Sequence, residues 1–313
     1  STFHAKRGEY QLGLALLEQI IPVAKQTNFL RLRARAHNTR AIIYIFQNKT
    51  YLAQQEFLKA FDIFKHYPND PYLSKVTANI SNIFQSLDMW DKALTYIKKA
   101  IEYYEQGNQK STKHLSLLHL NASNVYANIT SENALSIQRS HLDLANKYAV
   151  ESGNLRMITH VQSNLSVYWF KQGDLDLSFK YANQCLTNAQ LSKDTASSGY
   201  CNLYLAKTYL QKNQHKTAEK LLLKSLEEFT SIDLKVGLKL VYKQFALLHE
   251  LNKNYIKALE NTKLFHQAKL DSLFSKRQDK INNLEQKYES KAKQQEIALL
   301  SAKNALQTSK LSQ

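Results

Sequence analysis

Residues with small side chains recur about every forty positions, and this repeat limits the fold more than any other feature of the sequence. The first column of such residues comprises Gly13, Ala53, Ala93, Ser178, Ala218 and Ala258. A second column comprises Ala41, Ser81, Ser123, Ser166, Ala206 and Ala246. A third column comprises Ile20, Ala60, Ala100, Ala145, Cys185, Ser225 and Phe265. The columns predict stacked helical hairpins, because two antiparallel helices that cross closely leave no room for a large side chain at the contact.

Aromatic residues and turn residues follow the same repeat. The residue three positions after the second column is aromatic in five repeats: Tyr44, Phe84, Tyr126, Trp169 and Tyr209. Residues that favour turns stand between the expected helices of a hairpin, at positions 8–10, 48–49, 88–90, 173–174 and 213. Only 7 Gly and 3 Pro occur among the 313 residues, which is too few for the many turns of an all-β fold. We therefore expect an almost wholly α-helical protein.

Two segments resemble the tetratricopeptide repeat. They are residues 173–178 (Gly-Asp-Leu-Asp-Leu-Ser) and residues 89–93 (Met-Trp-Asp-Lys-Ala), the latter followed by Ile97 and Ala100. The resemblance implies an all-α, right-handed solenoid of about seven hairpins over residues 1–266. The period of about 40 exceeds the roughly 34 of that family, and the fourth unit carries about five extra residues, partly at 128–133. Armadillo and HEAT arrays have a similar period, but the glycine-type turns and both alanine columns favour the tetratricopeptide interpretation.

The C-terminal segment, residues 267–313, departs from the repeat. It is polar, and its apolar residues are spaced alternately three and four apart in two groups: Ile281, Leu284 and Tyr288, then Leu299, Ala302 and Leu306. This spacing predicts a long coiled-coil helix with a shift in register near Lys291. A helix of this kind pairs most simply as a parallel homodimer. The alternative is a solvated capping helix that folds back on the array.

Residues 284–300 resemble the linker that follows periplasmic tetratricopeptide sensors in bacterial membrane signalling proteins. In those families the helix continues into a transmembrane segment, and a cytoplasmic diguanylate cyclase (GGDEF type) or histidine kinase follows. The resemblance implies a periplasmic sensor region that meets the membrane only through segments outside this chain; a cytoplasmic location is the alternative. Residues 3–8 match only the end of a first helix, so we expect the natural protein to begin upstream of Ser1.

The chain is strongly basic, with a formal net charge of +16 from 42 Lys and Arg against 26 Asp and Glu. The basic residues are spread along the sequence with acidic residues among them, which is typical of solvated helix faces. The densest basic patch is Arg31, Arg33, Arg35 and Arg40. The sequence lacks a basic cluster interleaved with aromatics, so we do not expect it to bind nucleic acid.

The sequence shows no pattern that indicates catalysis. It contains no phosphate-binding glycine loop, nucleophile elbow or HExxH motif, and its acidic residues do not pair in an apolar context. His114 and His119 are five apart, which fits one face of a helix poorly as a metal site. We expect structural histidines, no metal, no cofactor and no enzyme activity within these residues.

The two cysteines flank a predicted turn near Lys193. Cys185 lies eight residues before Lys193, and Cys201 lies eight residues after it. These positions face each other in an antiparallel hairpin, so a disulfide is possible in an oxidising compartment if the Cα atoms lie within ~7 Å. The alternative is that both cysteines are small buried residues in the packing columns.

Two positions on each first helix are expected to face the concave groove of the solenoid: two residues before the second column and one residue after it. Candidate binding residues at these positions are Asn79, Asn82, Asn121, Asn124, Asn164, Tyr204 and Lys207. Asparagine offers both a donor and an acceptor, so a row of asparagines can pair with an extended peptide backbone. Tetratricopeptide relatives hold peptides with asparagines at the first position. The alternative is that these asparagines serve helix packing or solvent. Arg35 is a further candidate, for an anion at the other end.

Three functions remain open at this point. The first is a sensor module that binds a peptide or protein and relays the signal through its C-terminal helix to a membrane-tethered output domain, most simply a diguanylate cyclase or otherwise a histidine kinase. The second is a cytoplasmic peptide-pheromone receptor with tetratricopeptide repeats. The third, nucleic-acid binding, rests only on the net charge.

Overall fold

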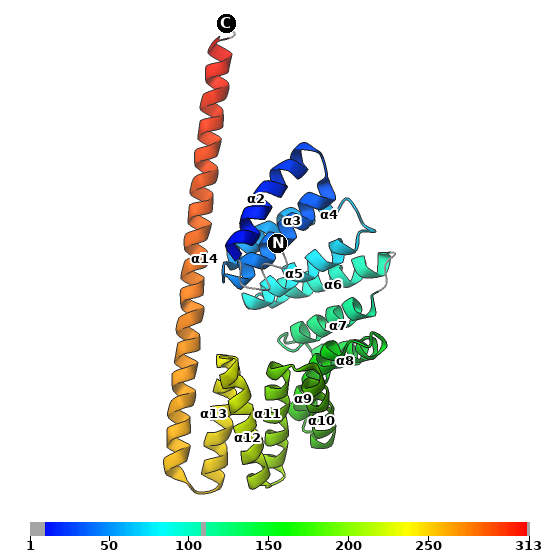
Figure 1. The fold of residues 1–313 in the computed structure, drawn as a ribbon, viewed down its shortest axis with the longest axis vertical. Helices are drawn as coiled ribbons and strands as arrows, with labels where there is room; N and C mark the ends of the chain where they lie inside the picture. Colours follow the sequence, from blue (N-terminus) through cyan, green and yellow to red (C-terminus); the bar gives the residue numbers. More distant parts are fainter. Residues whose placement is uncertain (1–9, 108–110, 312–313) are drawn as a thin grey trace. The chain divides into compact units, whose positions relative to one another are not determined.

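A computed structural model describes residues 10–107 and 111–311, and this part of the chain is helical throughout (Figure 1). The helices are α2 (Tyr10–Gln26), α3 (Leu30–Phe46), α4 (Thr50–Phe64), α5 (Pro71–Ser86), α6 (Trp90–Gln106), α7 (Thr112–Tyr126), α8 (Ala134–Glu151), α9 (Leu155–Gln172), α10 (Leu175–Ser192), α11 (Thr195–Gln211), α12 (His215–Ser231), α13 (Lys235–Leu251) and α14 (Tyr255–Leu311). The prediction of an all-α helical repeat is confirmed. The helix end expected at residues 3–8 lies outside the described residues.

The chain forms two compact units. One unit joins the residues up to Ile83 with those from Ser275 onward, and the other unit runs from Phe84 to Phe274. Within the second unit, α7 packs against α8, α9 against α10 and α11 against α12, as the helices of successive hairpins. The longer connection expected in the fourth repeat is present, since residues 127–133 lie outside the helices between α7 and α8.

Residues with a left-handed backbone conformation (positive φ) follow the ends of the helices and recur with the repeat. Five of these residues separate the helices of a hairpin: Asn48, Asp88, Gly173, Asn213 and Lys253. Four more separate one hairpin from the next: Asn28, Gly153, Lys193 and Asp233. Glycine, asparagine and aspartate tolerate a positive φ better than other residues, which explains most of these positions. The turns predicted at residues 48, 88, 173 and 213 are thereby confirmed.

The columns of small residues lie at the helix crossings. From Ala53 to Ser225 every member of the three columns is at most 1 % exposed. The approach is close enough for hydroxyl groups to reach the backbone of the neighbouring helix. Ser225 Oγ donates to the Gly199 carbonyl oxygen at 2.8 Å, and Ser116 Oγ donates to the Ala145 carbonyl oxygen at 2.8 Å. The repeat in the sequence therefore corresponds to a repeat of close backbone contacts.

Two further glycines pack against one aromatic ring. Phe229 on α12 is fully buried, and Gly199 on α11 and Gly237 on α13 contact its ring. A Cβ atom added to Gly199 would lie 2.5 Å from Phe229 Cε1, and one added to Gly237 would lie 2.6 Å from Phe229 Cγ. Both distances are too short for carbon atoms, so the ring occupies the space that a side chain would need.

The first unit contains a buried carboxylate. Glu56 on α4 is 5 % exposed and lies 2.7 Å from His37 Nδ1, 2.6 Å from Arg40 Nη2 and 2.8 Å from Lys59 Nζ. Burial alone would raise the pKa of Glu56, but the hydrogen bonds from His37 and Lys59 and the charge of Arg40 lower it to about 2. The carboxylate therefore stays charged and joins α3 to α4.

The C-terminal helix α14 is continuous from Tyr255 to Leu311. The predicted division at residue 266 falls inside this helix and coincides with no helix end. In the first unit, Asn283 Oδ1 accepts from the Tyr51 backbone N–H at 2.9 Å, in the first turn of α4. Ile281, Leu284 and Tyr288 are exposed by 39–72 %. The coiled coil and the homodimer remain predictions, because both need a second chain.

The contact between Gly199 and Phe229 predicts that a Gly→Ala substitution lowers the stability of the protein instead of raising it. Gly→Ala in a helix interior ordinarily stabilises by up to ~1 kcal/mol. We expect G199A to destabilise the protein by about 1–3 kcal/mol instead, because the added methyl group overpacks the Phe229 ring. Urea unfolding followed by circular dichroism measures the effect.

The matched control is the same substitution in an F229A background. There the ring is absent, so the methyl group that G199A adds should be neutral or stabilising. Equal destabilisation in both backgrounds would show that the ring is not the cause.

Candidate functional site

In the second unit the first helices of the hairpins form the inner layer. Helix α9 packs directly against α7 and α11, and α11 packs against α13. Among α7 to α13, the second helices α8, α10 and α12 make no comparable contacts with one another. A layer whose helices are closer together lies on the concave side of a curved stack. This packing favours the first helices as the inner layer of the unit, and the groove that they are expected to line stays a prediction.

Three of the predicted asparagines lie on these helices. Asn121 and Asn124 on α7 and Asn164 on α9 are half-buried. Asn164 Nδ2 donates to the His160 carbonyl oxygen at 2.8 Å, which leaves its Oδ1 atom for another donor. Asn124 and Asn164 line one pocket of about 270 Å³ together with Lys171. Trp90 on α6 and Gln138 on α8 line the same pocket, so it lies where first and second helices meet and brings together side-chain amides from neighbouring repeats.

The other predicted residues on the N-terminal side belong to the first unit. Asn79 on α5 is half-buried, and its Nδ2 donates to Asn38 Oδ1 on α3 at 3.2 Å. Asn82 is exposed on the same helix. The Arg35 guanidinium carbon lies 4.5 Å from the centre of the Tyr72 ring. Asn79 therefore has a packing partner within its own unit, as the alternative interpretation of the asparagines expects.

Tyr204 and Lys207 on α11 form a cluster with a residue that the sequence analysis missed. The Lys207 ammonium group lies 4.2 Å from the centre of the Phe170 ring and 4.4 Å from that of Tyr204. The two rings meet edge to face, with centres 5.8 Å apart. Phe170 lies four residues after Ser166, one turn further along α9. That spacing was the available signal, but only the packing of α9 on α11 reveals the contact.

The charge on Lys207 is poorly stabilised within the protein. Burial lowers the pKa of Lys207, and the like charges of Lys243 and Lys171 lower it further, to about 8. Burial also raises the pKa of Tyr204 above its usual value, with a smaller contribution from Tyr200. The cluster is therefore a cation in contact with two aromatic rings, at a position where the sequence predicts a groove-facing contact.

A pair of histidines lies between α7 and α8, with His119 buried and His141 half-buried. The Nδ1 atoms of His119 and His141 are 2.9 Å apart, and the His119 ring also stacks on Tyr148. Burial, followed by the neighbouring His141, lowers the pKa of His119 to about 4. Among the described residues no group of three or more His, Cys, Asp or Glu side chains is placed to hold a metal ion. The pair joins two helices through a hydrogen bond between neutral rings.

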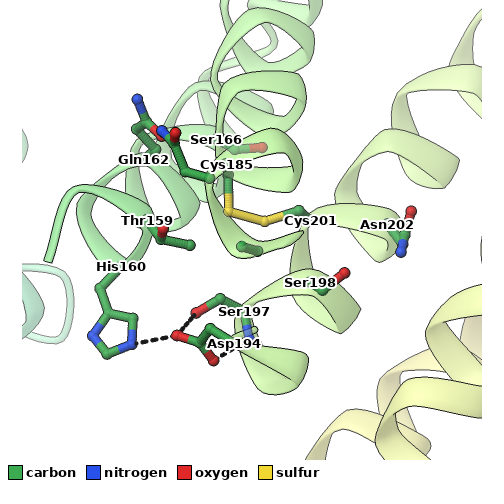
Figure 2. The surroundings of a disulfide bond; sticks show 12 residues. Thr159, His160, Gln162, Ser166, Cys185, Asp194, Ser197, Ser198, Cys201 and Asn202 are labelled. Carbon is green, nitrogen blue, oxygen red and sulfur yellow. Dashed lines mark hydrogen bonds and ion pairs between the residues drawn. A yellow bond between two sulfur atoms is a disulfide. The ribbon is translucent and has the colours of Figure 1, made fainter. Parts of the chain in front are cut away.

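Cys185 and Cys201 lie at the crossing of α10 and α11 (Figure 2). A disulfide joins them in the structure, and their Cα atoms are 6.1 Å apart, which meets the distance condition stated above. Beside them, Asp194 accepts from His160 Nε2 at 3.0 Å and from the Ser197 backbone N–H at 3.2 Å. Burial alone would raise the pKa of Asp194, but the hydrogen bonds from Ser197 and the charge of His160 lower it. Asp194 therefore caps α11 and connects it to α9.

Known proteins resemble this chain in structure but not in sequence. No family model matches the chain, and no curated protein sequence matches it. The apo form of RapI is similar over 85 % of this chain and 94 % of its own, with 14 % identity and a TM-score of 0.70. The apo quorum sensor NprR from B. thuringiensis is similar over 85 % of this chain and 86 % of its own, with 15 % identity and a TM-score of 0.55.

A third similar structure contains a ligand. It is the Rap conjugation gene regulator of plasmid pLS20 in complex with the Phr* peptide, similar over 78 % of this chain and 66 % of its own, with 14 % identity and a TM-score of 0.58. At such low identity these similarities establish the fold alone. The fold and the repeat place this chain in the class of tetratricopeptide-like α-solenoids. No helix of residues 10–107 and 111–311 is both long and apolar enough to cross a membrane.

The histidine pair predicts a loss of stability in acid. Between pH 4 and 6.5 the unfolded chain binds a proton at residue 119 and the folded chain does not, so the free energy of unfolding falls as the pH falls through this range. The loss should be on the order of 2–3 kcal/mol. Urea unfolding from pH 7.5 to 4.5 measures it.

H119Q should flatten this pH dependence whatever its effect on stability at pH 7. The exposed His66 provides the matched control, since H66Q should retain the slope. A slope that is unchanged in H119Q would remove the histidine pair as its cause.

The disulfide predicts a specific labelling pattern. Under denaturing conditions without reductant, iodoacetamide should modify neither Cys185 nor Cys201, and after reduction it should modify both. Mass spectrometry counts the added groups. In C185S the remaining Cys201 should react without reductant, and modification of both cysteines in the unreduced wild type would contradict the disulfide.

Proposed function

We propose that this chain is a non-catalytic, peptide-binding receptor that holds an extended peptide along the first helices of its repeats. The observation that carries the proposal is the placement of Asn121, Asn124 and Asn164. Their half-buried amides lie on neighbouring first helices, and two of them, Asn124 and Asn164, line one pocket. A surface that served only solvation would not need polar side chains held half-buried at a concave site.

The amides suit a peptide backbone chemically. Each asparagine offers an Nδ2 donor and an Oδ1 acceptor, and an extended peptide presents an N–H and a C=O group at every residue, about 3.3 Å apart along the chain. Pairing with the backbone gives affinity that does not depend on the peptide sequence. Sequence preference then comes from the side chains beside the amides, as in other modes of recognition of extended peptides.

The structural similarities support the cytoplasmic pheromone-receptor alternative more than the periplasmic sensor. One similar protein is described as a quorum sensor, and another was solved in complex with the Phr* peptide. None of the similar structures reported above is a periplasmic sensor. We therefore propose that peptide binding controls an interaction of this chain with a protein partner.

A second candidate function rests on helix α14. This helix has 57 residues, whereas most other helices in the described part of the chain have 17 or 18. A long polar helix with exposed apolar positions suits pairing and the relay of a signal to an output domain such as a diguanylate cyclase or histidine kinase. The comparisons bring no further support to this candidate.

Substitution of the asparagines tests the proposed function. The probe is a pool of fluorescein-labelled hexapeptides of mixed sequence, first selected for retention on the immobilised wild-type chain. We expect the N121A/N164A double variant to bind the retained peptides at least about tenfold more weakly, because each buried hydrogen bond contributes roughly 0.5–1.5 kcal/mol. Fluorescence anisotropy measures the affinity.

Asn183 on α10 provides a matched control. It is half-buried like Asn164 and makes the same bond to the carbonyl oxygen four residues earlier, at 3.0 Å to Phe179, but it lies on a second helix. N183A should bind the peptides as wild type does. The proposal fails if no peptide is retained, or if N121A/N164A binds as tightly as N183A.

A further inference from the structure

A second pocket of the second unit, of about 380 Å³, is lined by residues of α10, α11 and α12. Its lining consists of polar residues: Gln190 on α10, Asn202 on α11, and Lys224, Glu227, Glu228 and Ser231 on α12. Asn202 precedes Tyr204 by two residues, and positions two apart on a helix lie on different faces. This pocket is therefore separate from the predicted groove, and the inference drawn from it does not depend on peptide binding by the asparagines.

The carboxylate of Glu228 in this pocket has only neutral partners. Its side chain is half-buried, and its two oxygens accept hydrogen bonds from Ser198 Oγ and, at 2.9 Å, from Asn202 Nδ2. The exposed Glu227 adds a second carboxylate to the lining. The ion pairs of the described residues include neither of these carboxylates, nor the exposed Lys224 beside them. The pocket thus holds acidic groups without an internal counter-ion, unlike the site around Glu56.

Asn202 supplies an acceptor that lacks a donor. The residue is 2 % exposed, and its Oδ1 atom is buried without a hydrogen-bond partner among the described residues. Figure 2 shows its side chain extending from α11 on the side away from Cys185. Because Oδ1 and Nδ2 belong to one amide group and Nδ2 is bonded to Glu228, the unpartnered oxygen lies beside that carboxylate. A buried acceptor without a donor is unfavourable, so this arrangement suits a ligand that brings N–H donors.

A guanidinium or ammonium group has the chemistry that this pocket lacks. Either group carries a positive charge for the two carboxylates and offers only donors, three on an ammonium and five on a guanidinium. Each oxygen of Glu228 has two lone pairs, so it can accept from a ligand while it keeps its bond from α11. The planar guanidinium can donate to the carboxylate and to the neighbouring Asn202 Oδ1 at the same time, which favours arginine over lysine.

We propose that the pocket formed by Asn202, Glu227 and Glu228 binds a basic side chain of a protein partner, arginine in preference to lysine. Glu228 and the Asn202 Oδ1 atom accept hydrogen bonds from the bound group, and Glu227 adds attraction at the exposed rim. The chain as a whole is basic, with a formal net charge of +16, so a cation is attracted here by a local arrangement and not by the overall charge.

The test uses single amino acids whose ends are blocked as in a protein chain. The probes are the N-acetyl methylamides of arginine, of lysine and of citrulline, which is the uncharged analogue of arginine, together with free arginine. The full chain is labelled with ¹⁵N at asparagine, and the side-chain signal of Asn202 is assigned from its absence in N202S. Titration at constant ionic strength gives the dissociation constant of each probe from the shift of this signal.

We expect the blocked arginine to bind saturably and at least about tenfold more tightly than the blocked citrulline, with the blocked lysine between them. E227Q and E228Q should each weaken arginine binding at least about threefold, and K224Q should strengthen it because a like charge leaves the pocket. E250Q is the matched control, since it removes the same charge from an exposed position on α13 and should bind as wild type does.

Several results would overturn the proposal. Equal shifts with arginine and citrulline, or shifts that never saturate, would show that the pocket has no preference for a cation. A loss in E250Q as large as that in E227Q would assign the effect to net charge. E228Q also removes a contact between α11 and α12, so E227Q decides the question if circular dichroism shows that E228Q is unfolded. Tighter binding of free arginine than of the blocked form would point to a free amino acid and overturn the assignment to a protein partner.

Discussion

The close crossing of antiparallel helices is the constraint on which the rest of the structure depends. At each crossing an alanine, serine, glycine or cysteine lets two backbones approach until a serine hydroxyl bonds directly to the neighbouring carbonyl oxygen, as Ser225 does with Gly199. A larger side chain at any of these places would separate the helices and change the angle at which the next hairpin stacks. Phe229 shows the complementary requirement, since its ring fits only because two helices present glycine to it.

The same geometry underlies the predicted groove. Because the first helices pack on one another in the second unit, side chains at a fixed position in each repeat are expected to fall into rows on the side where these helices meet. The rows hold Asn121 and Asn124, then Asn164, then Tyr204 and Lys207. The scaffold fixes the backbone positions of these residues, so their identities can vary without any change in the packing columns. Under the proposed function, recognition and stability are therefore carried by different residues of the same helices.

The sequence predicts those parts of the structure that depend on local rules or on the repeat. The small columns, the left-handed turns at Asn48 and Gly173 and the facing positions of Cys185 and Cys201 all follow from spacing along the chain. Contacts set by the side-to-side register of neighbouring helices could not be predicted in this way. The approach of His119 to His141 and the fit of Phe170 beside Lys207 depend on how far one helix slides and rotates against the next. The sequence analysis considered His119 together with His114, whereas the structure places His119 against His141 on the neighbouring helix.

Glu56, which is buried, and Lys207, which is half-buried, show two ways in which this chain accommodates a charge withdrawn from water. Glu56 and Lys207 are both withdrawn from water, and in both cases burial disfavours the charged form. Around Glu56 the chain supplies three cationic or hydrogen-bonding partners, so the charge is satisfied internally and the pKa falls to about 2. Around Lys207 the chain supplies two rings and two like charges, and the described residues offer no carboxylate. The Lys207 charge is therefore accommodated by contacts with aromatic rings rather than by an ion pair with a carboxylate of the described residues.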